Sequence, residues 1–237
     1  MNAPAQLTYL PADPTGRLYR CLAHQDYEAF ATEIAAELPY ERVGYDRLLA
    51  IWVDLQERQI APPAEVLDVG CNNGLFSLGL GAAGYRVTGI ENNIATAAKS
   101  GYPARLLDEA ITVRDRLGWQ QVSFHEMDIA DYLTRTTTTP AVGLLLSVVH
   151  QWFAGYASTG QGEKSLAEIE KILRTFFSRI GRVVYYEGPE TEPAAADVPL
   201  PLPQWFQTQG WVTHITPLAV SVAANSHLRT LYRLERR

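Results

Sequence analysis

This 237-residue chain has the composition of a folded protein. Hydrophobic residues make up 47% of it and charged residues 19%, which excludes a disordered chain, and the length suffices for one α/β domain with a sizeable core. The net charge of −6 and the lack of any long Lys/Arg run argue against long nucleic acid as a partner. A C-terminal group of arginines fits either a small basic pocket or a solvated surface: Arg229, Arg233, Arg236 and Arg237.

The sequence shows no pattern of export or membrane insertion. The N-terminus lacks the charged region and apolar core of a signal peptide, and no apolar run approaches membrane-spanning length. Cys21 and Cys71 match neither a disulfide framework nor a metal-ligand spacing. We therefore expect a cytoplasmic protein without a membrane partner.

Two amphipathic helices are predicted near the N-terminus. Apolar residues recur every four positions over residues 26–38, and residues 44–58 place their apolar side chains on one stripe. We assign residues 1–60 to an N-terminal helical cap and residues 61–237 to the core of the protein.

The next stretch, residues 66–74, predicts a strand followed by a tight turn. Val66-Leu67-Asp68-Val69 is an apolar run that indicates a strand buried on both faces, and Gly70-Cys71-Asn72-Asn73-Gly74 forms the turn. The apolar residues after Gly74 predict a helix. A strand, a glycine turn and a helix in this order bring backbone N–H groups close to a ligand at a helix N-terminus.

The chemical nature of that ligand follows from the turn. A dinucleotide fingerprint requires G-x-G-x-x-G, whereas Gly70 and Gly74 are one position too close and the middle glycine is missing. Asp68 would repel a pyrophosphate, but it suits a ligand with an ammonium or sulfonium group. The turn therefore predicts a nucleoside with a positive arm, of which S-adenosylmethionine is the common one.

A second predicted strand, residues 85–91, ends in Glu91, with Asn92 beside it. An acid at this position can accept both hydroxyl groups of a ribose. The turn and this acid together resemble class I S-adenosylmethionine-dependent methyltransferases, whose first motif is a hydrophobic pair, Asp/Glu, x, Gly, x, Gly, x, Gly. The sequence departs from that motif at Asn72, where the family most often has glycine, but Asn tolerates a positive φ better than other non-glycine residues.

The resemblance implies S-adenosyl-L-methionine as cofactor and S-adenosyl-L-homocysteine as product. It implies a contact role for the turn residues and a ribose role for Glu91. In the resembled family a basic residue of the N-terminal helices often pairs with the methionine carboxylate, and Arg42 is the candidate here; the alternative is a surface arginine. The cofactor-binding residues expected from this reading are Asp68, Gly70, Cys71, Asn72, Asn73, Gly74, Glu91, Asn92, Asp128, Ile129, Ser147 and Arg42.

Two later strand ends complete the expected site. After a third strand at residues 121–124, Asp128 and Ile129 match the family's acid for the adenine amino group and the apolar residue that packs on the ring; alternatively Asp128 caps the following helix. Residues 141–149 form the most apolar strand, as a central parallel strand should be. Because ligands gather at the carboxyl ends of parallel strands, this places Ser147 and His150 beside the transferable methyl.

The resemblance implies an α/β fold with a doubly wound, mostly parallel seven-stranded sheet, helices on both faces (a Rossmann-like methyltransferase fold) and N-terminal cap helices. The remaining elements expected from the sequence are a helix over 163–180, a strand over 182–187, a mobile flap over 189–203, a short helix ending at Gly210 and an antiparallel hairpin of 211–216 with 228–234.

Methyl transfer to a hydroxyl or protonated amine requires a base. His150 is the candidate because its unperturbed pKa lies near neutrality, with Glu187 and Tyr186 as second choices; the alternative for His150 is a structural histidine. At the end of the central strand the sequence has neither the carboxylates of metal-dependent catechol-type methyltransferases nor the Asp/Asn-Pro-Pro-Tyr/Phe motif of amino-adenine methyltransferases. We therefore expect no metal and no nucleobase amino acceptor.

Four functions compete. The first is a methyltransferase for a small-molecule O- or N-acceptor, and the second is an RNA- or protein-directed methyltransferase, whose RNA form the acidic balance disfavours. The third is a non-catalytic module that binds S-adenosylmethionine. The fourth, a nicotinamide dehydrogenase, is disfavoured by the glycine spacing and by Asp68.

Overall fold

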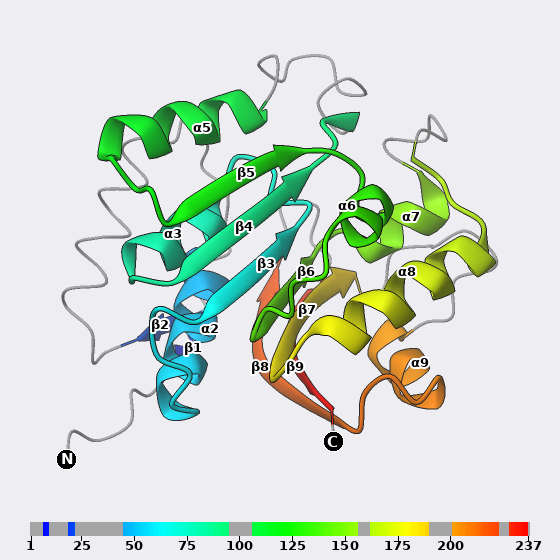
Figure 1. The fold of residues 1–237 in the computed structure, drawn as a ribbon. Coiled ribbons are helices and arrows are strands. Elements are labelled where there is room, and N and C mark those ends of the chain that lie inside the picture. Colours follow the sequence, from blue (N-terminus) through cyan, green and yellow to red (C-terminus); the bar gives the residue numbers. More distant parts are fainter. Residues whose placement is uncertain are drawn as a thin grey trace.

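The computed structural model describes residues 7–9, 19–21, 45–94, 106–155, 162–189, 201–222 and 228–236. Its largest feature is a seven-stranded sheet in the order β5-β4-β3-β6-β7-β9-β8 (Figure 1). The strands are β3 (Glu65–Val69), β4 (Arg86–Glu91), β5 (Val122–Glu126), β6 (Val142–Leu146), β7 (Val183–Pro189), β8 (His214–Val222) and β9 (Leu228–Glu235). The five strands from β5 to β7 are parallel, and β9 runs antiparallel to both of its neighbours. The predicted mostly parallel seven-stranded sheet is confirmed.

Helices cover both faces of this sheet, as predicted. They are α2 (Tyr45–Glu57), α3 (Leu75–Ala82), α5 (Leu106–Leu117), α6 (Ile129–Arg135), α7 (Val149–Ala154), α8 (Leu166–Arg179) and α9 (Leu202–Thr208). The first three lie on one face and the last four on the other (Figure 1). None of these described helices has the length and apolar content that a membrane crossing requires.

The core is split by the alternation of side chains along each strand. In β6, Leu144 and Leu146 pack toward α2 and α3, whereas Leu145 packs toward α8. Each is buried, and burying one such side chain contributes about 1.5–3 kcal/mol. Because both faces of the central strands are covered, nearly every residue of β6 must be apolar, which explains its sequence.

One predicted strand is shorter in the structure. The strand expected over residues 141–149 ends at Leu146, because Ser147 takes a φ of 56° and cannot continue an extended chain. The chain then turns into α7 at Val149. Because β6 ends at Leu146, Ser147 lies in the turn that follows it, at the carboxyl edge of the sheet.

Other boundaries differ by a few residues. The helix expected over 44–58 is α2, and the helix expected over 163–180 is α8, which begins with a capping box of Ser165 and Glu168. The strand expected over 211–216 begins only at His214, because Trp211 and Val212 are buried in the core beside α9 instead.

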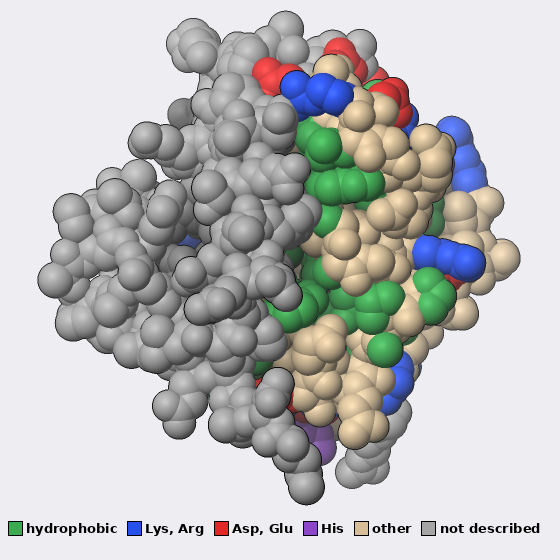
Figure 2. Space-filling model, turned by 90° about the vertical axis from the view of Figure 1, so that its left-hand side faces the viewer, with side chains coloured by type: hydrophobic (Ala, Val, Ile, Leu, Met, Phe, Trp, Pro, Cys, Tyr) green, Lys and Arg blue, Asp and Glu red, His purple; other side chains and the backbone are tan. Residues whose placement is uncertain are grey.

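The N-terminal part was less well anticipated. A small antiparallel sheet of β1 (Leu7–Tyr9) and β2 (Tyr19–Cys21) was not predicted. The helix expected over 26–38, Arg42 and the core of the expected flap, residues 190–200, lie outside the described residues. In a view of the side that carries α3 and α5, the hydrophobic side chains of the described part gather along the boundary with the grey residues, and the Lys and Arg side chains stand apart from one another (Figure 2).

Candidate active site

The turn after β3 and the turn after β6 meet at one edge of the sheet. β3 lies between β4 and β6, so the strand order reverses at this point, where ligands of open α/β sheets bind. A Cβ atom added at Gly70 would lie 3.0 Å from Val148 Cγ2, which shows how closely the two turns approach. The carboxyl ends of β3, β4 and β6 therefore bound a common site.

The turn after β3 has the backbone that the sequence predicted. Gly70, Asn72 and Gly74 all take a positive φ, of 70°, 54° and 77°. Asn72 thus takes a left-handed conformation, which Asn tolerates better than other non-glycine residues. At Gly74 a Cβ atom would lie 2.8 Å from Ala110 Cβ, so a larger residue is excluded both by conformation and by space.

The side chains of the turn hold its own backbone. Asn72 Oδ1 accepts a hydrogen bond from the Asn73 backbone N–H at 2.8 Å, and Asn73 Oδ1 accepts from the Leu75 N–H at 3.4 Å. Cys71 is buried, its backbone N–H donates to Ile90 O at 3.0 Å, and burial raises the pKa of its thiol. The turn is therefore held by hydrogen bonds within the protein itself.

Glu91, the predicted ribose acid, also fixes this turn. Its Oε2 accepts from the Asn72 N–H and its Oε1 from the Asn93 N–H, both at 2.9 Å. Each carboxylate oxygen can accept more than one hydrogen bond, so these two bonds still allow hydroxyl groups to donate to it. Glu91 lines a crevice at this edge together with Val69, Gly70, Ile90, Asn92, Met127, Asp128, Ile129, Val148 and Trp152.

Asp68 does not line this crevice. Its carboxylate is buried against α3 and accepts from Ser77 Oγ at 2.6 Å. Burial, reinforced by the charge of Glu91, raises the pKa of Asp68 to about 7, although the Ser77 hydrogen bond opposes the shift. A direct contact between Asp68 and a ligand stays a prediction.

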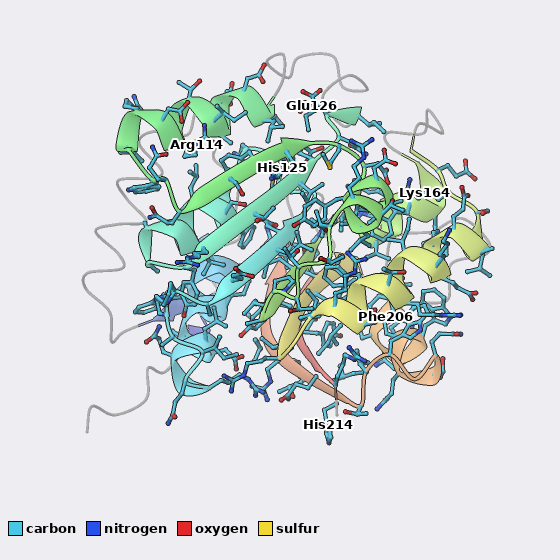
Figure 3. The ribbon with its side chains drawn as sticks, in the orientation of Figure 1. Arg114, His125, Glu126, Lys164, Phe206 and His214 are labelled. Carbon is cyan, nitrogen blue, oxygen red and sulfur yellow. The ribbon has the colours of Figure 1, made fainter. Side chains whose placement is uncertain are left out.

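Asp128 caps a helix, which is one of the two roles that the sequence left open; its role toward an adenine amino group stays a prediction. Its Oδ1 accepts from the Ala130 N–H at 2.8 Å and caps α6, and the residue also lines the crevice beside Ile129. Lys164, from the segment between α7 and α8, donates from Nζ to Asp128 Oδ2 at 2.9 Å (Figure 3). No local signal in the sequence indicates this pairing, because it depends on how α8 packs.

A charged cluster lies where β6 and β7 end. Glu187, opposite Leu146 in the sheet register, is fully buried. Arg47 Nη1 donates to its Oε2 at 2.6 Å, Arg229 Nη1 donates to its Oε1 at 3.3 Å, and Ser147 Oγ–H donates to its Oε2. Arg229 Nη1 also donates to Ser147 Oγ at 2.8 Å.

These contacts affect the pKa of Glu187, which is one of the expected bases. Burial alone would raise the pKa of Glu187, but the charges of Arg47 and Arg229, the Ser147 hydrogen bond and the charge of His150 outweigh it and hold that pKa below its usual value. Glu187 is therefore an ionised carboxylate that accepts from three side chains, which makes it a poor proton acceptor. His150, the second residue of α7, is close enough to act on it electrostatically.

Tyr186 points to the opposite face of the sheet. The side chains of adjacent residues in a strand point to alternate faces of the sheet. Tyr186 therefore packs edge-on against Phe206, with 5.2 Å between the ring centroids, while Glu187 faces α2. It is thus not brought together with Ser147 and Glu187. No pattern in the sequence points to Arg47, and the pattern around Arg229 fits two roles, because each arginine pairs with a carboxylate far away in the chain.

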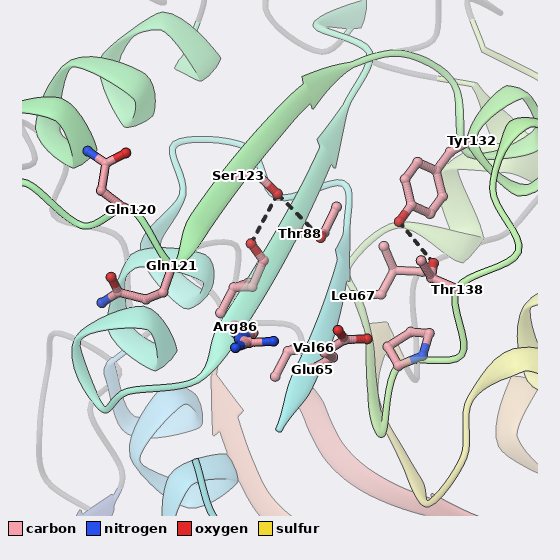
Figure 4. Close-up of a pocket in the computed structure, with 12 residues that line it drawn as sticks. Glu65, Val66, Leu67, Arg86, Thr88, Gln120, Gln121, Ser123, Tyr132 and Thr138 are labelled. Carbon is pink, nitrogen blue, oxygen red and sulfur yellow. Dashed lines mark hydrogen bonds between the residues drawn. The ribbon is translucent and has the colours of Figure 1, made fainter. Parts of the chain in front are cut away.

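A larger pocket of about 290 Å³ lies at the opposite edge, among the amino-terminal ends of the strands. Glu65, Arg86 and Gln121 line it, and Ser123 Oγ is 3.3 Å from Thr88 Oγ1 (Figure 4). None of the predicted site residues lines this pocket, and the strand-end rule favours the other edge. Within the described ranges, no three His, Cys, Asp or Glu side chains gather as metal ligands.

Solved structures share this fold, although no protein-family model and no curated protein matches the sequence. WbdD, in a complex with a kinase inhibitor, is 17% identical with a TM-score of 0.62, over 86% of this chain and 47% of that chain. The chain thus spans about half the length of the WbdD chain. Magnesium protoporphyrin IX methyltransferase (ChlM) from Synechocystis PCC 6803, with bound S-adenosylmethionine, is 14% identical with a TM-score of 0.53, over 91% and 85% of the two chains.

A third structure, the putative RNA methyltransferase PH1948 from Pyrococcus horikoshii, is 15% identical with a TM-score of 0.53, over 89% of this chain and 98% of that chain. The fold of this chain is therefore that of the class I S-adenosylmethionine-dependent methyltransferases.

Proposed function

We propose that this chain is an S-adenosylmethionine-dependent methyltransferase that acts on a small-molecule acceptor by O- or N-methylation, without a metal. The observation that supports it most is the crevice at the reversal point of the sheet, where Glu91 is the last residue of β4 and Asp128 follows the neighbouring strand β5. A nucleoside bound across these two strand ends would direct its ribose hydroxyls toward Glu91 and its adenine amino group toward Asp128. The fold that the chain shares with ChlM, which was crystallised with this cofactor, supports the same reading.

The residues of the crevice fit the cofactor. Glu91 would accept from the ribose hydroxyls, Ile129 would pack on the adenine ring, and Asp128 would accept from its amino group. Glycine at positions 70 and 74 allows the positive φ values of the turn, along which the methionine part would lie. When bound, the cofactor supplies an electrophilic methyl group on sulfur.

The protein's own part is to orient the acceptor, exclude water and move a proton. An imidazole nitrogen of His150 would accept the proton of the attacking hydroxyl or amine. The buried, ionised Glu187 would stabilise the imidazolium that forms, because a nearby negative charge favours the protonated ring. Glu187 would thus act through His150 rather than as the base.

Two other functions keep some support. An RNA-directed methyltransferase is favoured by the likeness to PH1948 but disfavoured by the net charge of −6. A module that binds the cofactor without catalysis would keep the crevice but would not depend on His150.

Calorimetric titration tests the cofactor. S-adenosylhomocysteine should bind and NAD should not; binding of NAD alone would overturn the proposal. A metabolite library with methyl-labelled S-adenosylmethionine then tests the acceptor class. Transfer of label to RNA or protein but to no metabolite would favour the second function, and no transfer to any of them would favour the non-catalytic module.

A further inference from the structure

Lys164 lies at a fixed point between two helices. Its backbone N–H donates to Trp152 O, in α7, at 2.7 Å. The next residue, Ser165, is the N-cap of α8 and forms a capping box with Glu168. The backbone of Lys164 is therefore held on one side by the end of α7 and on the other by the start of α8.

The side chain of Lys164 reaches the carboxylate at the edge of the crevice (Figure 3). Its Nζ donates to Asp128 Oδ2 at 2.9 Å, while Asp128 Oδ1 accepts from the Ala130 N–H at 2.8 Å. Each carboxylate oxygen can accept more than one hydrogen bond, so Asp128 can still accept from a ligand. The two side chains are 19% and 26% exposed, so the ion pair borders on solvent.

The ammonium group of Lys164 can also donate to a ligand. An ammonium has three N–H groups, and they rotate about the end of the side chain. Within the described part of the chain, Asp128 is the only residue to which the Lys164 side chain donates. Its other N–H groups therefore face solvent or a bound molecule beside Asp128.

The crevice next to this ion pair suits a flat ring. Apart from Asp128, the residues that line it near this end have apolar side chains: Ile90, Met127, Ile129, Val148 and Trp152. A small-molecule site typically combines apolar walls with a few polar groups that fix the orientation of the ligand. A base with its faces against these walls would turn its polar edge toward Asp128 and Lys164.

Asp128 and Lys164 together present a hydrogen-bond acceptor and a donor side by side. The carboxamide of Asn or Gln offers the same pattern, and it is the common partner of adenine, whose amino group donates while a neighbouring ring nitrogen accepts. A carboxylate alone supplies only the acceptor. The ion pair thus supplies both halves of the pattern from two separate segments of the chain.

We propose that Lys164 is a specificity-determining residue of the cofactor site, which donates to a ring nitrogen beside the adenine amino group that Asp128 accepts. Asp128 then has two tasks, since it also holds the ammonium in place. The inference deepens the proposed function and rests on it. The competing explanation is an ion pair that only supports the fold, and a pair as exposed as this one adds little stability.

The test compares three ligands by calorimetric titration of the full chain. They are S-adenosylhomocysteine and its 1-deaza and 7-deaza analogues, in which a C–H group replaces one of the two ring nitrogens that flank the amino group. The wild type should bind one analogue about tenfold or more weakly, because a hydrogen bond from a charged donor is lost. The weaker analogue identifies the nitrogen that Lys164 contacts.

Lys164→Met then assigns this difference to the ammonium. The variant removes the donor but keeps a side chain of similar length. It should bind S-adenosylhomocysteine about tenfold or more weakly and the discriminating analogue nearly as the wild type does, so the difference between the two ligands disappears. Lys164→Ala removes the same donor and should give the same result, so the comparison does not depend on the folding of one variant.

Lys171→Met is the matched control, because Lys171 is an exposed lysine on α8, and it should keep the wild-type difference. An ion pair that only supports the fold predicts that Lys164→Met weakens all three ligands equally, and this result would overturn the inference. Equal affinities of the wild type for all three ligands would overturn it as well. If S-adenosylhomocysteine binds in either of these cases, only this inference fails; if the wild type does not bind it at all, the proposed function fails too.

Discussion

Replacing Asp68 with asparagine should stabilise the protein above neutral pH. The Asp68 carboxylate is buried, and its pKa in the folded state is about 7 against an ordinary value of 3.8. The folded protein thus binds this proton more tightly than the unfolded chain does. The resulting stability is fully present below pH 3.8, declines as the pH rises toward 7, and is lost above that value.

The magnitude follows from the shift. Each pKa unit corresponds to about 1.36 kcal/mol, so the ionised Asp68 costs about 4 kcal/mol above pH 7, relative to a neutral side chain in the same place. At pH 5 the cost is only roughly 1.6 kcal/mol, because this pH lies much closer to the ordinary pKa of 3.8 that Asp68 has in the unfolded chain. Asparagine can still accept from Ser77 Oγ, so Asp68→Asn keeps the hydrogen bond and removes the charge.

Urea unfolding at several pH values measures this effect. The free-energy difference between Asp68→Asn and the wild type should grow by roughly 2–3 kcal/mol from pH 5 to pH 8. Asp115→Asn is the control for removal of a charge, since that carboxylate is 58% exposed. A difference that stays constant with pH, or that turns against the variant as the pH rises, would refute the reasoning. If Asp68 serves the sulfonium, the variant should also lose more affinity for S-adenosylmethionine than for S-adenosylhomocysteine.

Three further predictions concern the site. His150→Ala should lower turnover about 10²-fold or more while calorimetry finds the S-adenosylhomocysteine affinity nearly intact, and an unchanged turnover would remove His150 from the mechanism. Gly74→Ala should lower the unfolding free energy by about 2–4 kcal/mol, because alanine is strained at a positive φ and its Cβ atom would also crowd its neighbours. Gly118→Ala is the control: Gly118 has a φ of 70° but nothing within 4 Å, so this variant should lose only about 1–2 kcal/mol. Equal losses in the two variants would contradict the crowding at Gly74. Methyl transfer should persist in excess chelator, and its abolition by EDTA with rescue by magnesium would show that a metal takes part.

The sequence predicted those parts of the site that depend on local chemistry. Glycine and asparagine in the turn require or tolerate a positive φ, and the structure has such values at Gly70, Asn72 and Gly74. The apolar runs identified the central strands, because strands buried on both faces have few polar residues. The seven-stranded sheet follows from counting such runs together with the late hairpin.

The sequence could not predict contacts between distant segments. Arg47 and Glu187 are 140 positions apart, and Lys164 and Asp128 are 36 apart, so only the packing of α2 and α8 brings each pair together. The hydrogen bond between Asp68 and Ser77 on α3 was not predicted either, because it depends on how α3 packs against β3. Strand ends are also set by single backbone angles, such as that of Ser147, which a hydrophobic pattern does not reveal.

The direction of β9 has a practical consequence. Arg229 lies near the start of this strand, at the edge that carries the crevice, while Glu235 lies near its end, beside the first residue of β7. At about 3.4 Å per residue, the two are separated by about 20 Å. A fluorophore or affinity handle attached after Glu235 therefore lies at the edge of the sheet opposite to the crevice (Figure 1). The protein can then be immobilised for binding measurements with the crevice facing the solution.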